Sequence, residues 1–145
     1  MRCMWYRVIH DLIPTNVRLH RINVVPTDTC RQCTSIDTLE HRLIACGEGR
    51  RIWNYSKTLI TRMMRTTPAR IPDNLIMHPQ FHIWPLKRHR ATLWVLANAV
   101  IWRLQQQTNL TLQYYVDFLH RSRWKLVRHK RGRELVGNYL TALDV

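Results

Sequence analysis

Four side chains that can bind a transition metal lie close together in the first third of the chain. They are Cys30, Cys33, His41 and Cys46, in the spacing Cys-x2-Cys-x7-His-x4-Cys. Thiolate sulfur binds zinc at about 2.3 Å and imidazole nitrogen at about 2.0–2.1 Å, and four such ligands complete a tetrahedral shell. A complete shell leaves no open position for a reacting water. The spacing therefore predicts one structural zinc ion, held by a small knuckle within residues 28–47.

Two alternatives for the same cysteines stay open. They could be redox-active or free thiols, or they could hold another metal, although thiolate-rich tetrahedral sites favour zinc over hard cations. A disulfide is disfavoured, because Arg2 and Arg7 interrupt the apolar start of the chain and make it unlike a secretory signal. We therefore expect an intracellular protein. The fourth cysteine, Cys3, lies outside the cluster and is expected to be a small core residue.

Apolar residues on both sides of the cluster recur at helical spacing and predict the helices that must position it. A first helix is expected to end at Pro14, and Thr15 is expected to cap a second, short helix that ends before Pro26. A third helix is expected from about residue 48 to 65. The apolar face of the first helix consists of Trp5, Val8, Ile9, Leu12 and Ile13.

The stretch between His41 and Cys46 does not fit a regular helix. Asp37-Thr38-Leu39-Glu40 has the spacing of a capping box, so a helix is expected to begin there and to carry His41 in its first turns. Residues five apart in an α-helix lie about 140° away from a common face. His41 and Cys46 could then not both reach one ion. We therefore expect the helix to loosen or end near Cys46, with Gly47 free to adopt a positive φ there.

The pattern of apolar residues in the second half of the sequence also predicts helices. Prolines interrupt residues 66–86, where we expect irregular structure with at most one short helix. A nearly apolar helix should follow from Lys87 to about Gln107, as in the centre of a helical bundle. Another should begin after Thr111, and a last amphipathic turn or two should lie at residues 135–143. Little or no sheet is expected.

These elements predict an all-α protein, a compact helical domain with a small structural CCHC zinc knuckle near its N-terminus. A chain of 145 residues fits one domain, which we place at residues 1–145. Within it we expect a zinc-binding helical part at residues 1–66 and a basic helical part at residues 67–145.

The charge of the chain predicts a polyanionic partner. The chain has 23 Lys and Arg against 9 Asp and Glu, a formal net charge of +14. Most of its basic residues are Arg, whose planar guanidinium suits bidentate contacts to phosphate and stacking on bases. Charge alone leaves acidic proteins and anionic membranes open as partners. The longest apolar stretch, residues 91–104, is too short for a membrane helix, which needs about 20 residues.

The most basic segment of the chain, residues 121–133, predicts the nucleic-acid contacts. Trp124 lies within it and has two interpretations: it could stack on a base of RNA or DNA, or anchor its helix to the core, and we favour the anchor. The run Arg128-His129-Lys130-Arg131-Gly132-Arg133 could also serve as a nuclear import patch, which makes the nucleus the expected location. The candidate nucleic-acid-binding residues are Arg121, Arg123, Trp124, Lys125, Arg128, Lys130, Arg131 and Arg133.

Catalysis is not expected. Metal-dependent polymerases and nucleases need clustered carboxylates to hold Mg²⁺, and the nine acidic residues are scattered. Tyr115-Val116-Asp117-Phe118 matches the Tyr-x-Asp-Asp pattern of a polymerase only until its last position. Pro72-Asp73 has no Asp/Glu-x-Lys after it, as a restriction-like nuclease would need. We therefore predict that this chain is not an enzyme.

One combination of motifs resembles a known family. Residues 9–16, Ile-His-Asp-Leu-Ile-Pro-Thr-Asn, precede the metal ligands, which are accompanied by Asp37-Thr38 and His41-Arg42-Leu43 and followed by Ile52-Trp53. This order and spacing is similar to the zinc-binding domain C-terminal to the reverse transcriptase of non-LTR (LINE-type) retrotransposons. The resemblance covers roughly residues 5–60, and the rest is similar in kind to the basic helical tail of some insect elements. The family often has Gly after the second Cys, where this chain has Thr34.

The resemblance implies a role in binding element RNA or target DNA, with the three Cys and His41 as zinc ligands. It implies no catalysis by this part of such an element. A reverse transcriptase core is a further candidate partner. The alternative function is therefore a structural or protein-interaction module that docks on that core, with zinc and the Trp residues building the scaffold.

Overall fold

The structure is a computed structural model of the chain. It describes residues 2–67, 71–78, 90–104, 112–126 and 130–143, with side chains from residue 6 onward. The predictions for the Cys3 and Trp5 side chains, for Lys87, for Gln107 and for the Thr111 cap lie outside this part of the chain.

The described chain is all-α, as predicted, and carries the CCHC cluster near its N-terminus. A single β-bridge pairs Thr29 with Ile36 inside the cluster. The described residues also form three short helical turns: η1 (His41–Ala45), η3 (Asp73–Ile76) and η4 (Arg123–Leu126). The α-helices are α1 (Arg2–Ile9), α2 (Asn16–Arg21), α3 (Gly47–Met64), α4 (Arg90–Leu104), α5 (Leu112–Ser122) and α6 (Lys130–Thr141).

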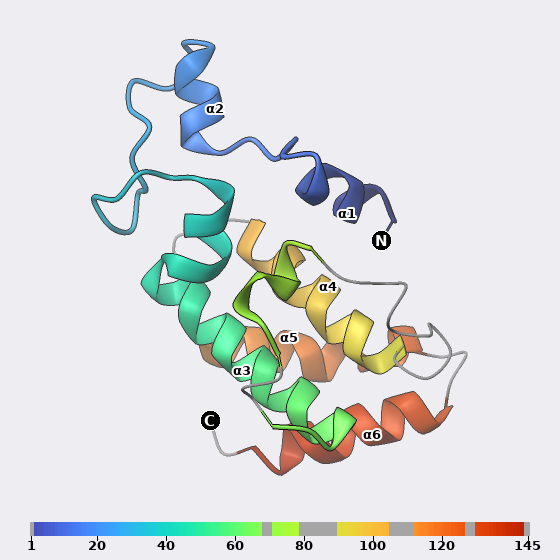
Figure 1. The fold of residues 1–145 in the computed structure, drawn as a ribbon. Helices are drawn as coiled ribbons and strands as arrows, with labels where there is room; N and C mark the ends of the chain where they lie inside the picture. Colours follow the sequence, from blue (N-terminus) through green and yellow to red (C-terminus); the bar gives the residue numbers. More distant parts are fainter. Residues whose placement is uncertain (1, 68–70, 79–89, 105–111, 127–129, 144–145) are drawn as a thin grey trace.

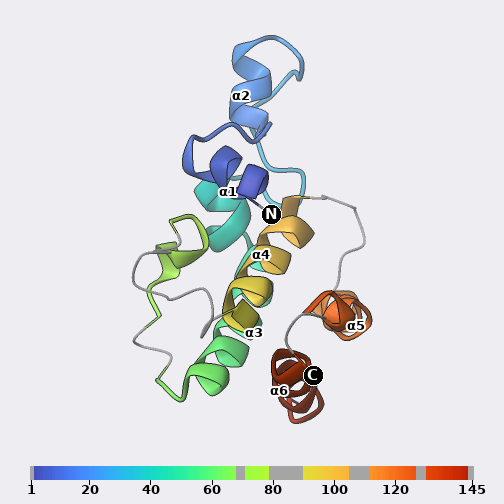
Figure 2. The same ribbon diagram turned by 90° about the vertical axis from the view of Figure 1, so that its right-hand side faces the viewer.

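Helices α3 and α4 lie side by side at the centre of the molecule, as both views show. Helices α5 and α6 cover one side of this pair, and the short turn η3 covers another (Figures 1 and 2). Helices α1 and α2 lie at the end of the molecule where α3 begins (Figure 1). The metal ligands occupy the same end, and the most basic segment lies with α5 and α6.

Helix α4 is central because its sequence is apolar almost all round. Residues 92–100 of the helix are all buried, and Trp102 and Arg103 are buried as well. This confirms the prediction of a central bundle helix. Its neighbour α3 buries a single stripe, which contains Ile52, Trp53, Ser56, Leu59 and Ile60.

Helix α1 is shorter than predicted. It ends at Ile9 rather than at Pro14, and Asp11 adopts a positive φ of 49° just beyond it. The backbone N–H of Leu12 donates to the Arg7 carbonyl at 2.7 Å, which closes the helix end early. Ile9 and Leu12 are consequently each 45% exposed, so the predicted apolar face is only partly buried. Thr15 precedes α2 as predicted, but its side chain makes no capping hydrogen bond.

The helices of the second half lie where they were predicted in the described residues, except that the last one is longer than the expected turn or two. One short helix, η3, lies in the proline-containing stretch, and its Leu75 and Ile76 are buried. The last helix, α6, begins at Lys130, five residues before the apolar pattern, so part of the basic segment is helical. None of the described helices is both long enough and apolar enough to cross a membrane.

Candidate functional site

The structure brings the four predicted metal ligands together. Their ligand atoms all lie within 4.8 Å of one another, and Cys33 Sγ is 3.2 Å from His41 Nε2. Ligands at the corners of a zinc-centred tetrahedron would be about 3.6–3.8 Å apart. Three sulfurs and one imidazole at this spacing can hold one metal ion, and the donor set fits zinc. Cys46 is buried, whereas Cys30, Cys33 and His41 are half-buried.

The first two ligands lie in a short turn that the β-bridge closes. The Cys30 N–H donates to the Ser35 carbonyl, and the Asp37 N–H donates to the Asp28 carbonyl, each at 2.8 Å. The Gln32 N–H points at Cys30 Sγ from 3.4 Å. Thr34 does not have a positive φ. Thr therefore fits this turn without backbone strain.

Backbone N–H groups and burial act oppositely on the two turn thiols. Burial raises the pKa of Cys30, because the charged thiolate loses water. The backbone N–H of Ser35 lowers the pKa of Cys33, because it donates to the sulfur. A metal requires thiolates, so the amide at Cys33 favours the form that binds.

The last two ligands lie on a π-turn. The Cys46 N–H donates to the His41 carbonyl at 2.7 Å, an i→i+5 hydrogen bond, and η1 (His41–Ala45) is a single turn of π-helix. Because such a bond places residues five apart one above the other, both side chains face the cluster. The predicted loosening of the helix is thus confirmed.

The role predicted for Gly47 is wrong. No described glycine has a positive φ, and Gly47 is the first residue of α3. The change of direction occurs one residue earlier, where Cys46 has an extended backbone with φ −60° and ψ 139°. An ordinary L-residue adopts these angles, so the turn requires no glycine.

The predicted capping box is only partly correct. Thr38 supplies the cap, because its Oγ1 accepts from the His41 N–H at 3.0 Å. Asp37 is instead buried, and its carboxylate accepts from the Asn16 N–H at 2.8 Å and from the Arg42 guanidinium. The ion pair therefore fastens the start of α2 to the π-turn that carries His41.

A second buried arginine reaches the cluster from α4. Arg103 is 4% exposed, and its Nε donates to the Arg42 carbonyl at 2.9 Å. Its guanidinium lies close enough to Cys46 and Cys30 to interact with them electrostatically. Burial lowers the pKa of Arg103, and negative charge on Cys46 and Cys30 opposes this effect.

The close packing around Arg103 requires a glycine at position 49. A Cβ on Gly49 would lie 2.6 Å from the Arg42 carbonyl oxygen and 3.2 Å from Arg103 Nε. Sequence reasoning missed Arg42, Arg103 and Gly49. One signal was available, since Arg103 is the one basic residue within the apolar stretch 91–104.

The chain matches no family model, no curated protein and no solved structure. The site must therefore be interpreted from its own geometry and chemistry.

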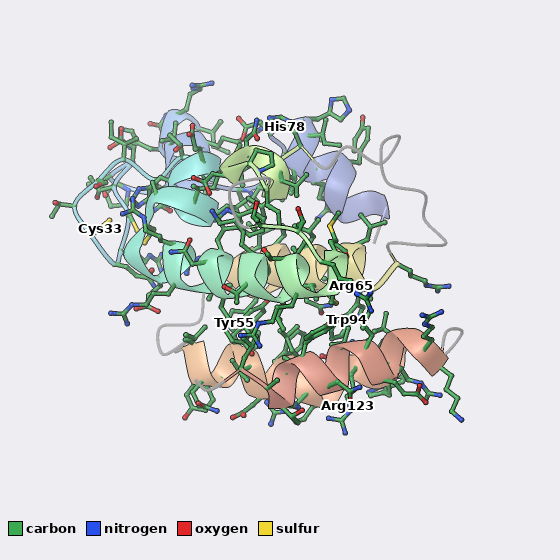
Figure 3. The ribbon with its side chains drawn as sticks, turned by 60° about the horizontal axis from the view of Figure 1, so that its bottom comes forward. Cys33, Tyr55, Arg65, His78, Trp94 and Arg123 are labelled. Atoms are coloured by element: carbon green, nitrogen blue, oxygen red, sulfur yellow. The ribbon has the colours of Figure 1, made fainter. Side chains whose placement is uncertain are left out.

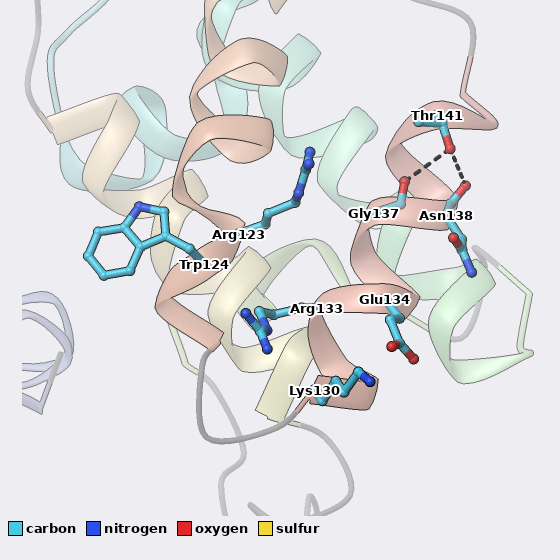
Figure 4. A pocket seen from close by; sticks show the side chains of 8 residues that line it. All are labelled: Arg123, Trp124, Lys130, Arg133, Glu134, Gly137, Asn138 and Thr141. Atoms are coloured by element: carbon cyan, nitrogen blue, oxygen red, sulfur yellow. Dashed lines mark hydrogen bonds between the residues drawn. The ribbon is translucent and has the colours of Figure 1, made fainter.

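The basic segment forms a second candidate site, on the far side of α3 and α4 from Cys33 (Figure 3). An open groove of about 500 Å³ lies between η4 and α6. In Figure 4, Arg123 extends from η4 toward α6, and Arg133 extends from α6 toward η4. Arg133 Nε is buried and has no hydrogen-bond partner in the described structure. We call this feature the basic groove, with its charged and aromatic lining Arg123, Trp124, Lys130, Arg133 and Glu134.

The interpretation of Trp124 as a core anchor is wrong. Its side chain is 60% exposed, and its ring points away from Arg123 in Figure 4. Leu126, two residues later, is buried and takes the core position in η4. Lys125 Nζ lies 6.0 Å from the centre of the Trp124 ring. Most of the indole is therefore exposed, and Lys125 lies over one of its faces.

The other candidate nucleic-acid residues are spread along the same side of the fold. Arg121 is exposed at the end of α5, and Lys130 and Arg131 are exposed at the start of α6. Of these, only Lys130 lines the basic groove. Arg128 lies outside the described residues.

The residues that resemble polymerase and nuclease motifs have structural partners. Tyr115 is fully buried, and its hydroxyl is 2.9 Å from Ser56 Oγ. Asp117 accepts from Gln113 on the same helix, and Asp73 pairs with Lys57. These two carboxylates therefore bind neighbouring side chains.

Proposed function

We propose that this chain is a zinc-stabilised nucleic-acid-binding domain, not itself catalytic. The observation that carries the proposal is the basic groove, where three cationic side chains and one carboxylate line a single open surface. An exposed indole lies at its edge. Phosphate attraction and base stacking are the two interactions that dominate binding of single-stranded or structured nucleic acid.

One zinc ion fits the Cys₃His cluster in this proposal. Cys30, Cys33, His41 and Cys46 would hold it, and the ion would cross-link the knuckle to the start of α3. The four protein ligands fill the tetrahedral shell, so the role is structural. The cluster thereby orients the helices on which the basic groove is built.

The basic groove suits a nucleic-acid strand that crosses η4. Arg123 and Arg133 offer planar donors for phosphate oxygens, and Lys130 adds a point charge. The indole of Trp124, on the other side of η4 from Arg123, offers a face for one base. Glu134 lies in the same groove and would repel phosphate locally, which limits the path of the strand.

The resemblance to the zinc-binding domain of non-LTR retrotransposons extends the proposal. On that basis the partner is element RNA or target DNA, the location is intracellular and nuclear, and the chain is a tail domain of a reverse transcriptase polyprotein. The motifs that precede and follow the metal ligands support this origin.

A salt-dependent titration tests the proposal. Labelled single-stranded RNA and DNA should bind the zinc-loaded chain at low salt, and the affinity should fall steeply as salt rises. Arg123→Gln combined with Lys130→Gln should weaken binding about tenfold or more. The matched control is Arg51→Gln with Arg62→Gln, which removes the same charge from exposed positions on α3. Equal loss in both variants, or no binding at low salt, would contradict the proposal.

A specific observation favours the alternative, a module that docks on a reverse transcriptase core. Large apolar side chains are exposed around α1, α2 and the knuckle, and such surfaces often mark protein contacts. The full set is Tyr6, Ile9, Leu12, Ile22, Val24 and Ile36. Co-purification of that core with the Arg123→Gln/Lys130→Gln variant, but not with Ile22→Ser/Val24→Ser, would support the alternative.

A further inference from the structure

A zinc ion in this cluster would create a partly buried anion. Three thiolates carry −3 and the ion +2, so the complex with neutral His41 has a net charge of −1. Its Cys46 ligand is only 2% exposed. A net charge in such a place is costly unless an opposite charge lies beside it.

Two buried arginines lie next to the cluster, and they differ in their partners. Arg42 forms an ion pair with Asp37, which is 2% exposed, so its charge is already balanced. Arg103 forms no ion pair with any carboxylate of the described residues. It instead donates to the Arg42 carbonyl at 2.9 Å, and it lies near enough to Cys46 and Cys30 for their charge to act on it.

We infer that Arg103 is the counter-ion of the metal complex, a positioning residue that α4 supplies to a site built by residues 30–46. The inference rests on the proposed zinc. Its consequence is a coupling: without the metal, Arg103 is a buried cation that pairs with no carboxylate of the described residues, and with the metal its charge is balanced. Zinc binding therefore favours the docking of α4 against η1 and the start of α3.

The packing is consistent with this role. The Arg42 carbonyl holds Arg103 Nε at 2.9 Å, and the absence of a side chain at Gly49 leaves room for both groups. The Arg42 carbonyl thus holds the Arg103 guanidinium beside the cluster, close to the start of α3. Such outer partners of metal ligands typically change metal affinity about 10–100-fold when they are mutated.

The first experiment measures zinc affinity by competition with a chelator at fixed pH. Arg103→Met, which removes the charge but keeps a long side chain, should lower the affinity at least about tenfold. Arg103→Lys should keep more of the affinity than Arg103→Met. The control is Arg62→Met, an exposed position about 24 Å along α3 from Cys46, which should leave the affinity unchanged.

The second experiment separates a charge effect from lost packing. Cys33→His turns the complex into a neutral Cys₂His₂ site, because one thiolate is replaced by a neutral ligand. In this background Arg103→Met should cost less than about threefold in zinc affinity, because no anion remains to be balanced. An equal loss in both backgrounds would overturn the inference and assign Arg103 to packing alone.

A third measurement needs no variant at Arg103. Zinc added to the metal-free wild-type chain should slow amide hydrogen exchange in the last turn of α4, as well as in the knuckle. Protection confined to residues 28–46 would overturn the coupling. A wild-type chain that binds no zinc would contradict the proposed metal itself, whereas unchanged affinity in Arg103→Met contradicts only the counter-ion.

Discussion

Arginine occurs in two contrasting settings in this molecule. Beside the Cys₃His cluster, Arg42 and Arg103 are each 4% exposed and bind a carboxylate and a carbonyl respectively. At the basic groove, Arg123 is exposed, and Arg133 Nε has no partner in the described structure. The same residue type therefore stabilises the fold at one site and leaves donors available at the other. Changes at the first site should affect folding, and changes at the second should affect binding.

Loss of the metal should have the largest effect. Cys33→Ser or a chelator should remove the zinc and much of the helical circular-dichroism signal, because metal binding supplies folding free energy. The loss should be several kcal/mol, since structural zinc sites contribute on the order of 10 kcal/mol in small domains. Cys33→His is the control, because it keeps a fourth ligand and should keep the metal. Helical signal that survives chelation unchanged would show that the metal does not stabilise the fold.

Breaking the buried ion pair should have the next largest effect. Asp37→Asn leaves the Arg42 charge uncompensated at 4% exposure, which should cost about 3–5 kcal/mol in urea unfolding of the zinc-loaded chain. The matched control is Asp73→Asn, since Asp73 is exposed and pairs with Lys57 on α3. Its cost should stay within about 1 kcal/mol. Similar costs for both variants would remove the contrast between buried and exposed charges.

The two glycines at the start of α3 offer a closer test of the packing. In Gly49→Ala the new methyl group meets the Arg42 carbonyl oxygen, and the variant should lose about 1–3 kcal/mol and bind zinc more weakly. Gly47→Ala has nothing within 4 Å and should be close to neutral. Unfolding midpoints and zinc affinities of both variants check this prediction. A neutral Gly49→Ala would mean that α3 can move away from η1 without cost.

A change at the exposed indole should leave stability nearly unaltered. Trp124→Ala should weaken binding of single-stranded nucleic acid by about 1–3 kcal/mol through lost stacking. Because the Trp124 side chain is 60% exposed, the substitution should change the unfolding free energy of the protein by less than about 0.5 kcal/mol. Trp53→Ala, at a fully buried position on α3, should show the reverse pattern. Strong destabilisation by Trp124→Ala would restore the core-anchor interpretation.

The sequence was sufficient to predict the features that depend on local patterns. The CCHC spacing identified all four ligands, and the five-residue gap between His41 and Cys46 predicted an irregular helix because the geometry of a regular one forbids it. The apolar stretch at residues 91–104 predicted the central helix. Each of these inferences needed only spacing along the chain.

Features that depend on tertiary packing were not predicted. Asp37 has the spacing of a helix cap, but an ion pair to Arg42 and a bond to Asn16 give its carboxylate stronger partners. A large aromatic side chain such as Trp124 often anchors a helix to the core. In η4, however, Leu126 takes the core position and the Trp124 indole is exposed. Arg103 reaches the Arg42 carbonyl only because α4 packs against η1, and no local sequence pattern predicts that contact.

The π-turn also fixes how α3 is rotated about its own axis relative to the four metal-binding side chains. Cys46 is both the last ligand and the residue before α3, so the helix continues directly from the cluster. Each residue turns an α-helix by about 100°. Deleting one residue between His41 and Cys46 would rotate the buried stripe of α3 by that angle and turn Ile52 and Trp53 away from α4. The number of residues in this gap therefore fixes which face of α3 enters the core.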